Sequence, residues 1–146
     1  MKTMKNILAA FLPFAVAAVC VAVPPPAGTD IDRILDAIQK VETGGEADPA
    51  NAVGDNGKAI GPMQIHRAYW KDAVQFDPSI GGTYEDCRDE DYARRIVVAY
   101  MTRYAPDWNV RTIARIHNGG PRGHKNPKTV NYANKVFKNY QTMTDN

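Results

Sequence analysis

The sequence predicts a mainly α-helical domain of four to five helices with a small β-hairpin. Apolar residues recur at spacings of three and four in segments 30–43, 86–104 and 127–141, as on the buried side of helices. The stretch between the first two helical segments is rich in glycine, asparagine and aspartate, and it contains the turn sequence Asp55-Asn56-Gly57. The chain shows no internal repeat, so these elements belong to one domain.

The first helical segment begins after Asp30, a residue type that favours the N-cap position. Its apolar residues share one face: Ile31, Ile34, Leu35, Ile38 and Val41. Gly44-Gly45 predicts the end of the helix, because glycine tolerates the left-handed conformation of a C-terminal cap. Glu42 then lies in the last turn, where the helix dipole disfavours negative charge. Beside buried neighbours, this carboxyl is expected to have a raised pKa.

The following segments complete the expected fold. Short strands near residues 52–53 and 63–65 would flank the Asp55-Asn56-Gly57 turn and form the hairpin. Residues 66–76 predict a short helix, 86–104 the longest one, and 110–117 a third. Residues 118–123, which include two adjacent glycines and a proline, predict a loop. Pro127 suits the first turn of the final helix.

The N-terminus has the pattern of a secretory signal peptide. Lys2 and Lys5 precede an apolar run over residues 7–23, with small residues before Pro24. We therefore expect a signal peptide at 1–23, a Pro-rich linker at 24–29, the folded domain at 30–141 and a frayed tail at 142–146. An uncleaved anchor remains an alternative, but the run is short for a membrane span. A secreted or periplasmic protein without stable membrane association is expected.

Cysteine and charge usage add two expectations. Removal of residues 1–23 leaves Cys87 alone, so no internal disulfide is expected and packing must supply stability. No acid occurs from Trp108 to Thr144, whereas seven bases do: Arg111, Arg115, Arg122, Lys125, Lys128, Lys135 and Lys138. Such a basic region would attract an anionic polymer such as a cell wall. A solvated basic helix face explains the same pattern, and both interpretations stay open here.

Two acids suit the hydrolysis of a glycosidic bond. That reaction uses one protonated carboxyl group as an acid and one ionised carboxylate as nucleophile or base, in environments that separate their pKa values. Glu42 at a packed helix end fits the acid, and Asp55 on a polar turn fits its partner. Asp48 is a second candidate for the partner. A surface glutamate and a turn aspartate would have the same pattern, so the residue types alone leave the assignment open.

Other chemistries find little support. His66, His117 and His124 lack the paired spacing of a zinc site, and we expect no metal and no cofactor. Ser79 is the only serine and has no nucleophile-elbow sequence around it. No phosphate-binding loop and no nucleic-acid-binding module is present, so nucleic acid is not an expected partner.

Four sequence blocks, in order, resemble the invertebrate-type lysozymes, the destabilase-like glycoside hydrolases. Val41-Glu42-Thr43-Gly44 is similar to the V-E-S-G of that family. Gly61-Pro62-Met63-Gln64-Ile65 followed by Tyr69-Trp70 resembles its G-P-F-Q-I and P-Y-W. The stretch 114–123, ARIHNGGPRG, nearly repeats its A-R-I-H-N-G-G-P-x-G, and 129–136, TVNYANKV, is close to its T-x-G-Y-W-x-K-V. The similarity extends from about residue 34 to residue 140.

The resemblance implies an α+β lysozyme-like fold and a muramidase, which cleaves the β-1,4 bond between N-acetylmuramic acid and N-acetylglucosamine in peptidoglycan. Glu42 matches the general acid of the family, and Asp55 lies near its second carboxylate. The substrate-binding residues of the family map onto Gln64, Tyr69, His117, Asn118, Gly119 and Tyr132. The glycan strands of peptidoglycan are then the expected partner.

The sequence departs from the family in two respects. The family is rich in disulfides, and this chain is poor in cysteine. Asn56, Gly57 and Lys58 stand where the family has serines after the aspartate, so the isopeptidase activity of some members is not supported. Two alternatives remain: a lytic transglycosylase or goose-type relative that uses Glu42 alone, and a non-catalytic wall-binding protein.

Overall fold

The computed structural model describes residues 25–143. This part of the chain contains five α-helices: α1 (Ile31–Thr43), α2 (Arg67–Phe76), α3 (Glu90–Tyr104), α4 (Val110–Gly119) and α5 (Val130–Thr142). Three short strands, β1 (Val53–Gly54), β2 (Ala59–Ile60) and β3 (Ile65–His66), form one antiparallel sheet. The predicted fold class, mainly α with a small β element, is confirmed. The expected signal peptide and residues 144–146 lie outside the described residues.

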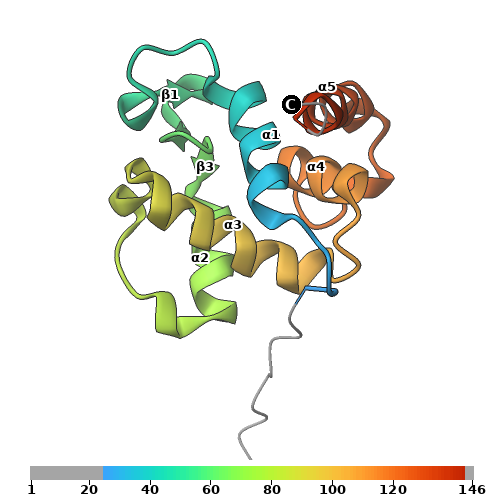
Figure 1. Cartoon of the computed structure of the whole chain (residues 1–146). Coiled ribbons are helices and arrows are strands. Elements are labelled where there is room, and N and C mark those ends of the chain that lie inside the picture. Colours follow the sequence, from blue (N-terminus) through green and yellow to red (C-terminus); the bar gives the residue numbers. More distant parts are fainter. Residues whose placement is uncertain (1–24, 144–146) are drawn as a thin grey trace, which may run out of the picture.

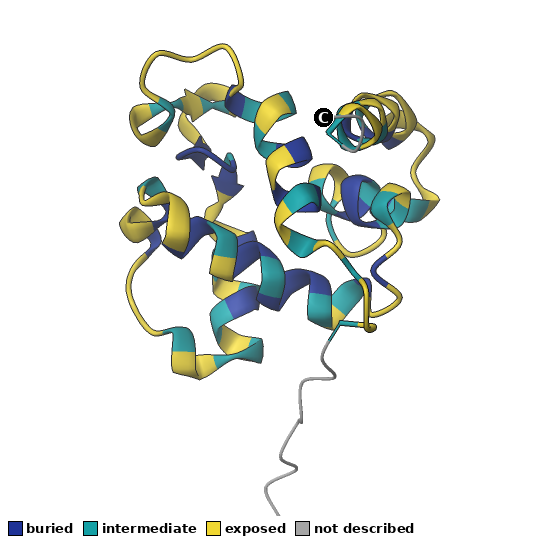
Figure 2. Ribbon diagram, viewed as in Figure 1, coloured by how far each residue is buried: buried dark blue, intermediate teal, exposed yellow. Residues whose placement is uncertain are grey.

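α3 crosses the middle of the molecule, with α1 and α2 on its two sides, the sheet near one end and α4 and α5 near the other (Figure 1). α5 packs on both α1 and α4, and α2 packs on α3. Buried residues occupy the inward sides of these helices (Figure 2). No helix of the described chain is long and apolar enough to cross a membrane.

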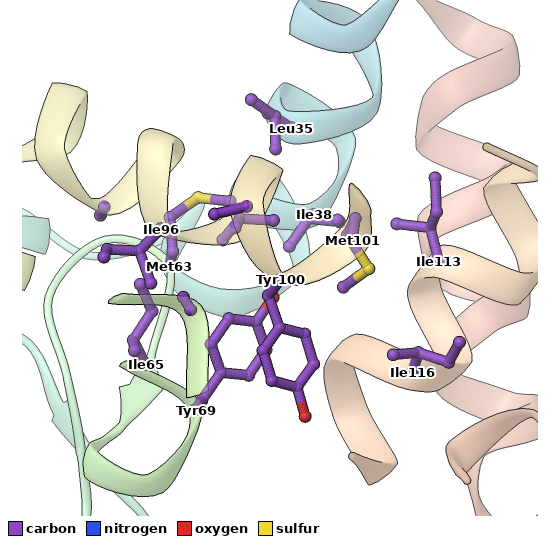
Figure 3. Packing of buried hydrophobic residues seen from close by; sticks show 14 of the residues in the cluster. Leu35, Ile38, Met63, Ile65, Tyr69, Ile96, Tyr100, Met101, Ile113 and Ile116 are labelled. Carbon is purple, nitrogen blue, oxygen red and sulfur yellow. The ribbon is translucent and has the colours of Figure 1, made fainter. Parts of the chain in front are cut away.

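The core is made of branched aliphatic, methionine and tyrosine side chains from every helix and from the sheet (Figure 3). Its largest fully buried members include Ile34, Ile38, Met63, Ile65, Ile96, Met101, Ile113 and Ile116. Cys87 is a free thiol in the same core, and burial raises its pKa to about 12. The thiol therefore stays protonated and packs as a small apolar group.

α1 ends where the sequence predicts, for a different reason. Asp30 caps its N-terminus by accepting a hydrogen bond from the backbone N–H of Arg33 at 3.0 Å. Gly44 has φ −66°, so the left-handed cap expected there is wrong. Glycine is required because a Cβ at this position would lie 2.4 Å from the carbonyl oxygen of Lys40.

The β element has one strand more than the predicted hairpin. β2 lies between the two expected strands, with Val53 opposite Ile60 and Ile60 opposite Ile65. Both residues of β2 are buried, so it lacks the alternating pattern by which a strand is recognised. Asp55 (φ 48°) and Asn56 (φ 55°) form the left-handed turn between β1 and β2, as the Asp-Asn-Gly sequence favours.

Two helix boundaries also differ from expectation. α3 begins at Glu90 rather than near residue 86, because Asp89 caps it by accepting a hydrogen bond from the N–H of Tyr92 at 2.8 Å. The preceding residues Tyr84–Arg88 form a short 3₁₀ helix instead. At the other boundary, α4 continues through Asn118 and Gly119, which were expected in a loop. The helix therefore fixes the direction in which Asn118 projects.

Gly61 and Gly57 provide a test of the packing under the sheet. Both have positive φ, +74° and +89°, but a Cβ at Gly61 would lie 2.0 Å from the backbone oxygen of Cys87, whereas that at Gly57 would meet nothing within 4 Å. We expect Gly57→Ala to lower the free energy of unfolding by about 1–2 kcal/mol. Gly61→Ala should lower the free energy of unfolding by the same amount and by about 1–3 kcal/mol more, because the added methyl group overpacks the site. Urea denaturation measures both, and equal losses would contradict the described packing.

Candidate active site

Side chains from three helices and the sheet converge at the C-terminal end of α1. Glu42 lies in the last turn of α1, and His117 lies near the end of α4. Tyr132 comes from the first turn of α5, the helix that packs on both of the others. Asp55 and Gln64 come from the turns that connect the strands. Residues that are distant in the sequence are therefore brought together by the packing of α5.

Two adjacent cavities share Glu42 and Gln64 and so form one continuous groove. The smaller, of about 290 Å³, is lined by Glu42, Asp55, Ala59, Gln64, His66, His117 and Asn118. The larger, of about 560 Å³, is lined by Glu42, Gln64 and the segments 46–48 and 51–54. Glu42 thus stands near the middle of the groove, and Asp55 is on the side of the smaller cavity.

Size alone does not mark the site. A cavity of about 770 Å³ lies elsewhere, between the start of α1, the end of α2 and α3. Its lining is largely apolar and includes Ile31, Leu35, Phe76, Ile80 and Val98. Each of the two cavities at Glu42 is smaller, but together they combine carboxyl, imidazole and amide groups, which a polar substrate requires.

One oxygen of Glu42 is held by two groups. The Tyr132 hydroxyl donates a hydrogen bond to Oε1 at 2.5 Å, and Nε2 of His117 lies 3.5 Å from the same oxygen. Within the described chain no hydrogen-bond partner is found for Oε2. The carboxyl side chain is 19 % exposed, and Glu42 lines both cavities of the groove. The carboxyl group is therefore fixed through Oε1 and free to act through Oε2.

His117 is held in turn by groups behind the groove. Its Nε2 is 3.2 Å from the carbonyl oxygen of Met63, and its Nδ1 is 3.3 Å from the hydroxyl of Tyr69. A carbonyl oxygen only accepts, so Nε2 carries a hydrogen, and Nδ1 of the neutral ring accepts from Tyr69. The Tyr69 ring stacks on Tyr100 with centroids 3.6 Å apart, and the two rings lie side by side in Figure 3.

These contacts decide the pKa of Glu42. Burial raises it, but the hydrogen bond to His117, the charge of that ring when protonated and the hydroxyl of Tyr132 lower it, and the lowering is the larger effect. The raised pKa expected from the sequence is therefore wrong. In the reverse direction, burial and the nearby Glu42 charge raise the pKa of Tyr132 well above its ordinary value, so its hydroxyl remains a donor.

Asp55 has a contrasting environment. Its side chain is 56 % exposed, and its carboxylate lies 3.5 Å from Nε2 of His66. Asp48 borders the neighbouring cavity, but both of its oxygens accept hydrogen bonds from Asn51, one from the backbone and one from the side chain. Of the two aspartates, Asp55 thus has the carboxylate with fewer hydrogen bonds to neighbouring residues.

The six residues expected to bind substrate fall into two groups. Gln64, His117 and Asn118 line the groove. The other three lie behind its surface. Tyr69 is 8 % exposed and contacts His117, Tyr132 supports Glu42, and a Cβ at Gly119 would lie 2.6 Å from Cγ2 of Thr129.

Sequence reasoning missed two residues of the groove. His66 lines the smaller cavity, and strand alternation after the buried Ile65 is the signal that could have found it. Val53 lines the larger cavity and is 56 % exposed, which is unusual for a large apolar side chain. Among residues 25–143, no group of three or more His, Cys, Asp or Glu side chains could hold a metal ion.

Comparison with known proteins agrees with this arrangement. The Destabilase family model matches residues 32–139. The chain is 34 % identical to a lysozyme of Ostrea edulis over 110 residues, which cover 72 % of this chain and 77 % of that protein. It is 35 % identical to a lysozyme of Meretrix lusoria, over 73 % of this chain and 87 % of the relative.

A solved structure gives the same result. The crystal structure of Tapes japonica lysozyme superposes with a TM-score of 0.60 at 31 % identity, and the match covers 71 % of this chain and 85 % of that one. The family model spans more than half of the chain, and the matched segment contains every side chain of the groove. The chain therefore belongs to the destabilase family, the invertebrate-type lysozymes.

Proposed function

We propose that Glu42 and Asp55 carry out the glycosidase reaction of this protein on the glycan strands of bacterial peptidoglycan. As a member of its family the protein is a lysozyme-type glycosidase, a muramidase. The observation that supports the residue assignment is the contact of Tyr132 and His117 with Oε1 of Glu42, a residue that lines both cavities of the groove and whose Oε2 has no hydrogen-bond partner within residues 25–143. A carboxyl group held in this way is oriented to give its proton to one side only.

In the first step, the proton on Oε2 passes to the glycosidic oxygen as the bond to the anomeric carbon breaks. Tyr132 then stabilises the carboxylate that forms by donating its hydrogen bond to Oε1, and Nε2 of His117 lies 3.5 Å from the same oxygen. Asp55 is exposed and polar in its surroundings, which suits the ionised partner that attacks or stabilises the oxocarbenium-like centre. A water molecule then attacks the anomeric carbon, and Glu42 takes up the proton that the water loses.

The site of action follows from the substrate. Residues 1–23 have the composition of a secretory leader, and peptidoglycan lies outside the cytoplasmic membrane. We therefore place the protein outside the cytoplasm, with the domain at 30–141 as its catalytic part. Gln64 and Asn118 line the same cavity as Glu42 and would hydrogen-bond the sugar hydroxyl and acetamido groups.

Substitution of the carboxyl groups tests the assignment. Glu42→Gln should lower the release of soluble sugar from peptidoglycan by about 10²–10⁴-fold, because the general acid is lost. Asp55→Asn should lose about 10²-fold or more by the same reasoning. Asp48→Asn keeps a good capping residue and should stay within a few-fold of the native rate.

The products separate the alternatives. Mass spectrometry should find hydrated reducing ends after digestion. Anhydro ends together with a normal rate for Asp55→Asn would establish a transglycosylase that uses Glu42 alone. Binding to peptidoglycan without release of sugar by the native protein would establish a wall-binding protein.

The lowered pKa of Glu42 predicts how activity depends on pH. The acid must be protonated, so kcat/KM should fall as pH rises through the pKa of Glu42, and the enzyme should work best on the acid side. His117→Gln removes the imidazole whose hydrogen bond, and whose charge when protonated, lower this pKa, so the alkaline limb of the profile should move to higher pH. Titration of the Glu42 carboxyl by NMR should show the same direction. An unmoved limb, or one moved to lower pH, would contradict the contribution of His117.

Tyr69 should act as a positioning residue through His117. Tyr69→Phe keeps the stack on Tyr100 but removes the hydrogen bond at Nδ1, and we expect kcat to fall about fivefold, the equivalent of one hydrogen bond, with KM unchanged. The loss should vanish when His117 is already Gln. Tyr104→Phe is the matched control, since that hydroxyl bonds Asp72 on α2 instead. Additive losses in the double variant would show that Tyr69 acts independently of His117.

A further inference from the structure

We propose that the outer side of α5 and the turns before it bind the phosphodiester polymers of bacterial cell walls. This basic face consists of Arg122, Lys125, Lys128, Lys135 and Lys138, all of them exposed. The inference rests on the proposed function in one respect: the wall that carries such a polymer is also the substrate of the groove.

Acidic and basic residues are concentrated in different parts of the described chain. Residues 25–107 contain nine Lys and Arg and fifteen Asp and Glu, a net charge of −6, whereas residues 108–143 contain seven Lys and Arg and no acid, a net charge of +7. The two parts nearly cancel in sum. Solubility depends on net charge, which would be the same if acidic and basic residues were mixed along the chain. Solubility therefore does not explain why they are separated.

The bases of the two parts are also used differently. In the acidic part, Arg33, Arg67, Arg88, Arg94 and Arg103 each form an ion pair with a carboxylate. Among the described residues, no Lys or Arg of 108–143 takes part in an ion pair of this kind. The positive charge of the basic face is therefore not neutralised within the molecule.

The two arginines of α4 hold this part of the fold together and are not counted in the basic face. Arg111 donates to Oδ1 of Asn134 at 2.7 Å and lies 3.9 Å over the ring of Phe137. Arg115 donates to Oγ1 of Thr129 and to the carbonyl oxygen of Asn126. Within residues 25–143 no such contact is found for the side chains of the five remaining bases, so their charges are available to a partner.

The basic face adjoins the groove. Tyr132 of α5 donates to Glu42 at the groove, and the same helix carries the exposed Lys135 and Lys138. Exposed residues cover the outward side of α5 (Figure 2). Arg122 follows four residues after Asn118, which lines the groove. The opposite wall carries Glu46, Asp48 and Asp55. An anionic polymer would therefore be repelled at the sheet and attracted at α5, which orients it across the groove.

The spacing and composition favour an extended polymer. Lys128 to Lys138 spans roughly 15 Å along the helix, with the exposed amides of Asn131 and Asn134 between the bases. None of the three cavities described above has a base of this face among its lining residues. Val130 is the only large apolar side chain exposed on this face of the described chain, so the face lacks the apolar side with which a helix enters a bilayer.

The pH dependence of the site favours phosphate over carboxylate as the bound group. Protonation of Glu42 calls for acid conditions, under which carboxylates of a wall lose charge. Phosphodiesters remain ionised there. A face that works together with this groove would keep its attraction only for the phosphodiester polymer.

Two triple variants that remove equal charge test the proposal. Lys128→Gln/Lys135→Gln/Lys138→Gln changes the basic face, and Lys40→Gln/Lys58→Gln/Lys71→Gln removes three exposed lysines from the acidic part. Binding is measured in a Glu42→Gln background on walls that carry teichoic acid and on the same walls after hydrofluoric acid has removed it. The first triple should bind the intact walls about tenfold or more weakly at low salt, with a shallower salt dependence, and the second should match the parent.

On extracted walls all three proteins should bind equally. When the native Glu42 is kept, both triples should degrade soluble peptidoglycan glycan fragments that carry no teichoic acid at the native rate. Equal affinity of the two triples for intact walls would overturn the proposal, as would an equal loss on extracted walls. Tighter binding to phosphatidylglycerol vesicles than to intact walls would assign the face to membranes instead. If the native protein releases no sugar from extracted walls while the difference in binding between the two triples persists, the proposed function fails and the proposal for the basic face is still supported.

Discussion

The contact of Tyr132 and His117 with one oxygen of Glu42 is the constraint on which the site depends. It joins the end of α1 to the end of α4 and the start of α5, so it forms only when α5 packs on both other helices. It also offsets the burial of the carboxyl group, which by itself would raise the pKa of Glu42. The orientation and the protonation of this carboxyl group therefore have one physical origin.

Support for that contact extends into the core. His117 is held between the Met63 carbonyl and the Tyr69 hydroxyl, and Tyr69 is fixed by its stack on Tyr100 of α3. These groups pack among isoleucine and methionine side chains that surround α3 (Figure 3). The chain has a free buried Cys87 in this core, so close packing takes over the stabilisation that disulfides supply in cysteine-rich domains.

The sequence predicted those features of the site that depend on residues close together in the chain. The helical face from Ile31 to Val41, followed by two glycines, placed Glu42 at a helix end, and the Asp-Asn-Gly turn placed Asp55 beside the sheet. The direction of the Glu42 pKa could not be predicted in this way, because Tyr132 is 90 residues away and reaches the carboxyl only through packing. The central strand β2 was missed because both of its residues are buried. The start of α3 was predicted too early, because Asp89 rather than an earlier residue caps the helix.

A crystal structure of the Glu42→Gln variant with an N-acetylglucosamine oligomer across the groove tests the central claim most directly. We predict that a glycosidic oxygen lies within about 3.2 Å of the atom at position 42 that points away from Tyr132, with the Asp55 carboxylate facing the adjoining sugar. An oligomer whose glycosidic oxygens all lie far from that atom, or that reaches position 42 from the side of Tyr132 and His117, would contradict it.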